Sequence, residues 1–298
     1  MQAAELAKRF RVTDGDDFRL KHFDPGETCG LDIAKDEARE LLRAGVERLR
    51  DLQERLYAEK RWSLLIVLQA IDTAGKDGTI EHVMSGINPQ GCEVTSFKAP
   101  NSLELRHDFL WRTTCALPER GEIGIFNRSY YEEVLVVRVH EGLLQKQGLP
   151  PKLIGKDIWQ ERFESIRDFE RHLSRNGTVI LKFFLNLSKD EQRRRLLARI
   201  DEPDKNWKFD AADLTERGYW NEYQAAYEDA IAHTATKQAP WHVIPADNKW
   251  FTRLVVAATV VDCLERLDPK FPRIDDEARS VMAKARKQLL AEDDNRKG

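Results

Sequence analysis

The strongest constraint on what this chain can fold into is the segment SLLIVLQA at 63–70, in which only Ser63 and Gln69 are polar. A short and nearly continuous apolar run is typical of a strand that is buried on both faces of a parallel sheet. The next residues, IDTAGKDG at 71–78, contain two glycines, and TIEHVM at 79–84 has a helical pattern. This order of strand, loop and helix predicts an α/β fold whose chemistry lies at the loop.

Further apolar runs predict four more strands. They are CEVTSF at 92–97, EIGIFN at 122–127, TVILKFFL at 178–185 and WHVIP at 241–245. The remaining segments include helix-like patterns, and we expect helices at 32–60, 102–116, 129–146, 152–175, 188–200, 216–236, 248–266 and 275–292. Strands that alternate with helices predict a doubly wound parallel sheet covered by helices.

Length and composition predict one large α/β domain over residues 1–298, with an N-terminal helical extension at 1–60, because 41% of the residues are apolar. The net charge of −3 is too small for the whole molecule to attract nucleic acid or a membrane, so neither is expected as a partner. The four cysteines form no CxxC pair, and no apolar stretch approaches the roughly 18 residues of a membrane span or resembles a signal peptide. We therefore expect a cytoplasmic protein with reduced thiols.

The loop resembles a phosphate-binding P-loop, GxxxxGK followed by Ser or Thr, but it departs from that pattern at both ends. Ala70 stands at the first glycine position and Asp77 replaces the hydroxyl residue. In such a loop, backbone N–H groups and the positive end of the next helix hold an anion, while the lysine reaches the terminal phosphate oxygens. The candidate phosphate-binding residues here are Ala74, Gly75, Lys76, Asp77 and Gly78. The alternative is a strand-to-helix turn that contains glycine and lysine by chance.

Asp72 lies inside this loop, where a carboxylate repels phosphate unless a cation separates them. Because position 77 carries no hydroxyl, a metal needs another ligand, and we predict that Asp72 binds Mg²⁺, with Mn²⁺ as a substitute. The alternative role for Asp72 is that of a base for the acceptor proton, although phosphates ionised near neutral pH need no strong base.

Asn127 and Arg128 follow the predicted strand at 122–127, at the edge where open α/β sheets bind ligands. Asn127 is predicted as a second metal ligand through its amide oxygen, and Arg128 as a bidentate clamp on phosphate. The alternative is an exposed strand end with a solvated arginine. Glu132 and Glu133 are candidates for the metal shell or the acceptor site, or simply first-turn carboxylates favoured by a helix dipole.

Basic residues are concentrated after the predicted strand at 178–185. They are Arg193, Arg194, Arg195, Arg199, Lys205 and Lys208. A run of this kind is commonly a solvated helix face. In a phosphotransferase-like chain it predicts instead a lid, at about 188–212, whose basic side chains bind phosphate and neutralise charge on the moving phosphoryl group. Lys98, Arg106 and Arg112 are further candidates, for clamping an acceptor nucleotide.

Taken together, these motifs resemble the polyphosphate kinase 2 family. The resemblance rests on QAIDTAGKDGTIEHVMSGINPQGCEV, SFKAPN, HDFLWR, GEIGIFNRSYYEEVLVVRVH, FFLNLSKDEQRRRLLARIDEPDKNWKF and APWHVIPADNKWFTR, which extend from about residue 62 to 253. The family's loop pattern GxDxxGK is found here as AxDxxGK, and its acidic residue or Asn before Arg as Asn127-Arg128.

The resemblance implies transfer of the terminal phosphoryl group of inorganic polyphosphate to a nucleoside mono- or diphosphate, with Mg²⁺. It implies a P-loop kinase-like three-layer sandwich with a central parallel sheet, similar to thymidylate kinase, with a helical lid, in a single-domain member that forms a homo-oligomer. The version of the motifs in this chain is most similar to the branch that accepts both AMP and ADP. The expected catalytic residues are Asp72, Lys76, Asn127, Arg128, Arg195 and Arg199.

Two other functions stay open from the residues alone. An ATP-dependent nucleoside monophosphate kinase has the same order of strands and helices. Against this function, position 77 carries Asp instead of Ser or Thr, and position 127 carries Asn instead of Asp. A non-catalytic protein that binds polyphosphate or RNA through the arginine run is the other alternative.

Overall fold

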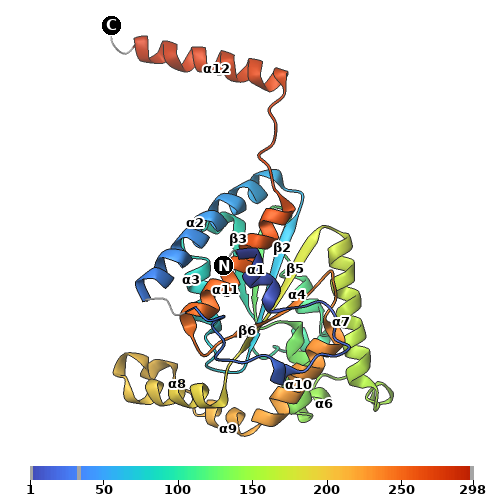
Figure 1. The fold of residues 1–298 in the computed structure, drawn as a ribbon. Helices are drawn as coiled ribbons and strands as arrows, with labels where there is room; N and C mark the ends of the chain where they lie inside the picture. Colours follow the sequence, from blue (N-terminus) through green and yellow to red (C-terminus); the bar gives the residue numbers. More distant parts are fainter. Residues whose placement is uncertain (1–2, 32–34, 296–298) are drawn as a thin grey trace.

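The computed structural model describes residues 3–31 and 35–295, and in them the chain forms a six-stranded sheet in the order β1-β6-β5-β2-β4-β3 (Figure 1). The strands are β1 Arg11–Val12, β2 Ser63–Ala70, β3 Cys92–Ser96, β4 Ile123–Asn127, β5 Thr178–Asn186 and β6 Trp241–Pro245. Strands β2 to β6 pair in parallel, as predicted. The edge strand β1 pairs antiparallel with β6 and was not foreseen, because two residues carry no periodic pattern.

The helices account for most of the remaining chain. The α-helices are α1 Ala3–Arg9, α2 Lys35–Glu59, α3 Lys76–Val83, α4 Trp111–Thr114, α5 Val136–Val139, α6 Gly142–Gln145, α7 Ile158–Arg175, α8 Lys189–Asp201, α9 Ala212–Gly218, α10 Trp220–Thr234, α11 Lys249–Leu267 and α12 Asp276–Asn295. The 3₁₀-helices are η1 Leu20–His22, η2 Pro89–Gly91, η3 Glu104–Arg106, η4 Tyr130–Val134, η5 Pro151–Leu153 and η6 Pro203–Lys208. The start of the helix predicted at 32–60 includes residues 32–34, which lie outside the described residues.

Four helix predictions were wrong in their continuity. In one of them, 152–175, η5 is followed by a turn and α7 begins only at Ile158. The segment 102–116 contains only η3 and α4, because the side chains of Asn101 and Asp108 accept hydrogen bonds from nearby backbone N–H groups and form turns. The segment 129–146 is divided into η4, α5 and α6, and 216–236 is divided between α9 and α10 near Gly218.

Two apolar cores, one on each face, fix the sheet between helical layers. All eight residues of β2 are buried, and their side chains alternate between the faces. Leu64, Ile66 and Leu68 pack in the core that contains α2, α3 and α11, whereas Leu65 and Val67 pack with η4, α7 and α10. Figure 1 shows these groups of helices on opposite sides of the sheet, so the predicted three-layer arrangement is confirmed.

The core on the η4 side contains a buried ion pair. Lys182 is fully buried in β5, and its Nζ donates to Glu170 at 2.7 Å, to the Thr234 carbonyl at 2.8 Å and to the Tyr131 hydroxyl at 3.0 Å. Glu170 also accepts hydrogen bonds from the hydroxyls of Tyr130 and Tyr131, at 2.9 Å each. This network attaches η4, which follows Arg128, to the centre of the sheet.

The C-terminal helix α12 stands apart from the sheet at the end of the segment 268–275, which has no regular structure (Figure 1). Its side chains are mostly exposed. Among the residues that the structure describes, no helix combines the length and the apolar character needed to cross a bilayer.

The buried pair gives a test of the fold. We expect Lys182→Met to lower the free energy of unfolding by about 3–5 kcal/mol, because the Glu170 carboxylate then stays buried without a counter-charge. The double variant Lys182→Met/Glu170→Gln removes both charges and should recover most of that loss. Urea unfolding followed by circular dichroism measures both; equal stability of the single variant and the wild type would show that the pair does not support the core.

Candidate active site

The loop after β2 has the geometry of an anion-binding turn. Thr73 and Gly75 have positive φ angles of 69° and 100°, and α3 begins at Lys76. The Lys76 Nζ donates to the Ala70 carbonyl at 3.1 Å, so the lysine folds back along the loop. Burial lowers the pKa of Lys76, and the nearby Arg128 guanidinium lowers it further. The backbone N–H groups at the start of α3 therefore lie beside a positioned ammonium group.

Parallel pairing of β2 with β4 brings the predicted motif Asn127-Arg128 to this loop, because Leu68 lies opposite Asn127. Asn127 Nδ2 donates to Asp77 Oδ1 at 2.6 Å. Arg128, which has a left-handed φ of 65°, donates to Asp72 Oδ1 at 2.8 Å and to Glu132 Oε2 at 3.0 Å.

The pKa of Arg128 is raised, mainly by Glu132 and then by Asp72, against the opposing effect of burial. A strained backbone held by two ion pairs gives the guanidinium a fixed direction.

A cleft of about 930 Å³ opens over the loop and is strongly basic. Nine lysine and arginine side chains line it, against four aspartate and glutamate side chains. The basic residues are Lys76, Lys98, Arg128, Arg195, Arg199, Lys205, Lys208, Lys249 and Arg253. Most of the residues predicted for catalysis and phosphate binding therefore lie in one cleft, although Arg193 and Arg194 are exposed on α8 and do not line it.

Arg195 lies beneath the loop rather than above it. Its side chain is 8% exposed, and its guanidinium donates to the carbonyls of Thr73, Ala74, Ala246 and Asp247, at 2.6–3.2 Å. Its Nε donates to Glu191 at 2.7 Å. All five N–H donors of Arg195 thus have protein acceptors. This placement differs from that of a free lid arginine, because the hydrogen bonds attach α8 to the loop and to the end of β6.

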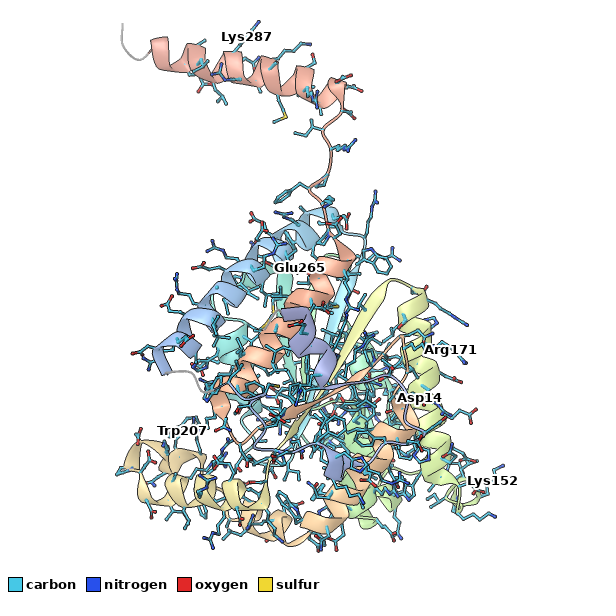
Figure 2. The ribbon with its side chains drawn as sticks, viewed as in Figure 1. Asp14, Lys152, Arg171, Trp207, Glu265 and Lys287 are labelled. Atoms are coloured by element: carbon cyan, nitrogen blue, oxygen red, sulfur yellow. The ribbon has the colours of Figure 1, made fainter. Side chains whose placement is uncertain are left out.

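The lid segment continues from α8 into η6. Arg199 donates to the Lys208 carbonyl at 3.1 Å and to Asp213 at 2.7 Å, and burial raises the pKa of Asp213. Lys205 forms an ion pair with Glu202. Trp207 is 79% exposed at the edge of the molecule, with Lys208 Nζ 5.0 Å from its ring centroid (Figure 2). The lysines of η6 thus lie along the outer wall of the cleft.

Two basic residues of the cleft were not among the predicted site residues. Lys249 and Arg253 lie on the first turns of α11, directly after β6, and burial lowers the pKa of each. Arg253 Nη2 lies 3.4 Å from the position that a Cβ at Gly78 would occupy, so it approaches the start of α3. Their position after a predicted parallel strand was the signal that could have identified them.

A second pocket, of about 490 Å³, adjoins the cleft. Phe97, Lys98 and Arg128 line both. Of the residues predicted for the acceptor, Lys98, Arg112, Glu132 and Glu133 line this second pocket. Arg106 is exposed and lines neither. Because four of the residues predicted for the acceptor line this space, we refer to it as the acceptor pocket.

The carboxylates of the cleft fit a metal that is shared with a substrate. No three His, Cys, Asp or Glu side chains in residues 3–31 and 35–295 are grouped so as to hold a metal ion by themselves. A hard cation such as Mg²⁺ commonly takes only one or two protein carboxylates and completes its shell with phosphate oxygens and water. Asp72 and Asp77 line the cleft beside the loop and are donors of the right kind.

Comparison with known proteins gives consistent results. Residues 32–272 match the family model described as Polyphosphate kinase 2 (PPK2). The chain is 53% identical to an ADP-polyphosphate phosphotransferase of Rhodopseudomonas palustris, covering 95% of this chain and 98% of that protein. It is 47% identical to an AMP/ADP-polyphosphate phosphotransferase of Meiothermus ruber, covering 89% and 96%.

A crystal structure of polyphosphate kinase 2 from Arthrobacter aurescens TC1 has the same fold, with a TM-score of 0.86 and 41% sequence identity. The match covers 96% of this chain and 97% of that one. The region matched by the family model contains the loop, Asn127-Arg128, the lid segment and the start of α11. From its motifs, its fold and these matches, the chain belongs to the polyphosphate kinase 2 family.

Proposed function

We propose that this chain, a polyphosphate-dependent nucleotide phosphotransferase, accepts both AMP and ADP and uses Mg²⁺. The observation that carries the proposal is the junction at Arg128, where a basic cleft of about 930 Å³ meets a separate pocket that can hold a second substrate. The name of the relative in M. ruber supports both acceptors, and the name of the relative in R. palustris supports ADP. The predicted homo-oligomer stays a prediction.

In this proposal the polyphosphate chain lies along the cleft with its terminal unit at the loop. The N–H groups at the start of α3 and the Lys76 ammonium bind the terminal phosphoryl oxygens. Lys205, Lys208 and Lys249 bind phosphates further along the chain, as their places in the cleft allow. A cleft of this kind suits a long polyanion because each phosphate needs its own positive partner.

Arg128 has the central role in the transfer. It lines both spaces, so its guanidinium can contact the donor's terminal phosphate and the acceptor's phosphate together. Holding both in line lowers the entropic barrier, and its charge stabilises the transferring group. Arg199 adds charge from the lid segment, whereas Arg195 acts as a positioning residue that keeps the loop in shape.

Asp72 and Asp77 are proposed to hold the divalent metal that a kinase of this family implies. Such a metal, when bound, neutralises phosphate charge. Asn127 positions Asp77 through the 2.6 Å hydrogen bond, and Arg128 positions Asp72. The acceptor phosphate is already ionised near neutral pH, so neither carboxylate is needed as a strong base.

Donor and acceptor assays test this function directly. With Mg²⁺ and polyphosphate as the only donor, we expect both AMP and ADP to be phosphorylated, and chelation of the metal with EDTA should stop the reaction. Chromatographic detection of the nucleotide products measures each rate. Phosphorylation of AMP with ATP but not with polyphosphate would contradict the proposal and favour a nucleoside monophosphate kinase.

Lys76→Ala tests the role of the loop. We expect it to reduce kcat by roughly 10²–10³-fold or more, because one positioned charge on the transferring group is lost. The far-UV circular dichroism spectrum should not change. Lys152→Ala is the matched control, since Lys152 is exposed and remote from the cleft (Figure 2). Similar rates for both variants would exclude Lys76 from the chemistry.

The lowered pKa of Lys76 predicts a pH effect. The ammonium form binds phosphate, and a lysine with a lowered pKa loses its proton at a lower pH than an ordinary lysine. We therefore expect kcat/KM to fall as pH rises, beginning below the usual titration range of lysine near 10.4. Lys76→Arg keeps its charge throughout that range, so its residual activity should lack this alkaline decline. If Lys76→Arg shows the same alkaline decline as the wild type, a group other than Lys76 causes the decline.

A further inference from the structure

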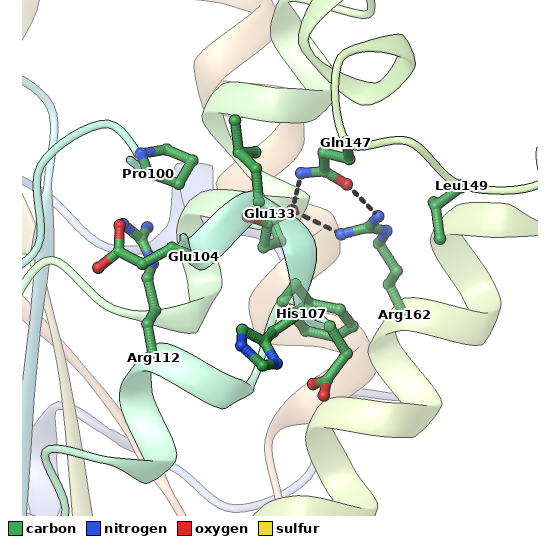
Figure 3. A pocket seen from close by; sticks show the side chains of 11 residues that line it. Pro100, Glu104, His107, Arg112, Glu133, Gln147, Leu149 and Arg162 are labelled. Carbon is green, nitrogen blue, oxygen red and sulfur yellow. Dashed lines mark hydrogen bonds and ion pairs between the residues drawn. The ribbon is translucent and has the colours of Figure 1, made fainter. Parts of the chain in front are cut away.

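Neither metal binding nor the helix dipole, two of the roles considered for Glu133 from the sequence, explains the environment of this residue. It is 4% exposed, and it lies where the acceptor pocket adjoins a smaller hollow of about 80 Å³. Figure 3 shows the side chains that line this hollow, with Gln147 and Arg162 on the same side of Glu133 and both directed toward it. A buried carboxylate is costly unless its charge is paired and its oxygens accept hydrogen bonds.

Two side chains fix one oxygen of this carboxylate. Arg162 Nη1 and Gln147 Nε2 both donate to Glu133 Oε2, each at 2.6 Å. Arg162 Nη2 also donates to Gln147 Oε1 at 2.7 Å, which closes a triangle of three side chains. The Arg162 guanidinium, itself 4% exposed, lies 4.7 Å from the centroid of the Phe109 ring. The carboxylate is therefore paired with a cation and held in one orientation.

The other oxygen, Oε1, receives neither of these hydrogen bonds, and Glu133 lines the acceptor pocket. An ionised carboxylate can only accept hydrogen bonds, so it selects a group that donates them. It also repels phosphate. Four cationic side chains line the pocket: Lys98 and Arg128 on the side that it shares with the cleft, and Arg112 and Lys146 elsewhere. Because transfer requires the donor and the acceptor phosphate to meet, the acceptor phosphate belongs on the shared side.

The remaining walls near Glu133 are largely apolar. Leu105, Val136, Val137 and Leu143 line the pocket, which suits the faces of a flat aromatic ring. The pocket extends along η4, with Arg128 before that helix and Glu133 near its end. A nucleotide whose phosphate is bound at Arg128 would therefore extend its base toward Glu133.

We propose that Glu133 accepts a hydrogen bond from the exocyclic amino group of the acceptor base and makes the pocket selective for adenine. Arg162 and Gln147 are positioning residues for this carboxylate. The inference rests on the proposed function, because it assigns a base contact to the acceptor pocket. A base with hydrogen at the 6-position offers Oε1 no donor, and a carbonyl there meets a like partial charge.

The test compares acceptors that differ only at the 6-position of the purine. With saturating polyphosphate, kcat/KM is measured for the 5′-mono- and diphosphates of adenosine, purine riboside and inosine. We expect the wild type to prefer adenosine over the other two by roughly 10- to 100-fold, as for a lost hydrogen bond to a buried charge. Values within about twofold of one another would overturn the inference, and this panel needs no variant.

Variants assign the preference to a residue. In Glu133→Gln the amide can rotate and donate, so we expect the preference for adenosine over inosine to fall to less than about threefold. Glu141→Gln makes the same chemical change at an exposed position outside both spaces and should keep the wild-type preference. An unchanged preference in a folded Glu133→Gln would overturn the assignment.

Direct binding separates this inference from the proposed function. Isothermal titration calorimetry of the wild type with ADP and with purine riboside 5′-diphosphate measures base selection without any transfer. If ADP binds tighter by the expected ratio but no phosphoryl group moves from polyphosphate, the proposed function fails and the base contact stands. Equal dissociation constants would refute the base contact even in an active enzyme.

Discussion

The site depends on the hydrogen bonds that Arg195 donates to the back of the loop. A loop that turns its N–H groups toward an anion turns carbonyl groups away from it, and buried carbonyls need donors. Arg195 supplies them to Thr73 and Ala74, and the same guanidinium reaches Ala246 and Asp247 after β6. One planar side chain therefore links the loop, the lid helix and the strand end that leads into α11.

A chain with a net charge of −3 nevertheless forms a strongly basic cleft. The carboxyl ends of β2, β4, β5 and β6 lie at one edge of the sheet, and each is followed by a segment that contributes lysine or arginine. The acidic residues that balance these charges lie mostly elsewhere. A local concentration of one sign in a cleft attracts a polyanion regardless of the charge of the whole molecule.

The sequence was sufficient to predict the parallel sheet, because a largely apolar run of eight residues that leads into a glycine-containing loop is short for a helix and typical of a buried strand. The sequence was not sufficient to predict which arginine of the run at 193–195 contacts the loop. Arg193, Arg194 and Arg195 are adjacent and of one type, yet only Arg195 is buried. Successive residues on a helix point about 100° apart, so which of the three faces the loop depends on how α8 packs. Glu133 is similar, since its partner Arg162 lies on α7 and no local pattern connects them.

Relative to the P-loop pattern, Asp77 in the loop and Asn127 at the end of β4 are best understood as one exchange. The usual arrangement has a hydroxyl after the lysine and an aspartate at the end of a neighbouring strand. Here the carboxylate is on the loop, at Asp77, and the neutral residue is on the strand, at Asn127. The two side chains meet at 2.6 Å, so the pair still brings one carboxylate and one neutral polar group to the same place. Asp72 then adds a second carboxylate, which Arg128 balances at 2.8 Å. The cleft therefore gains a negative charge for a metal without losing the positive charge that a phosphate chain requires.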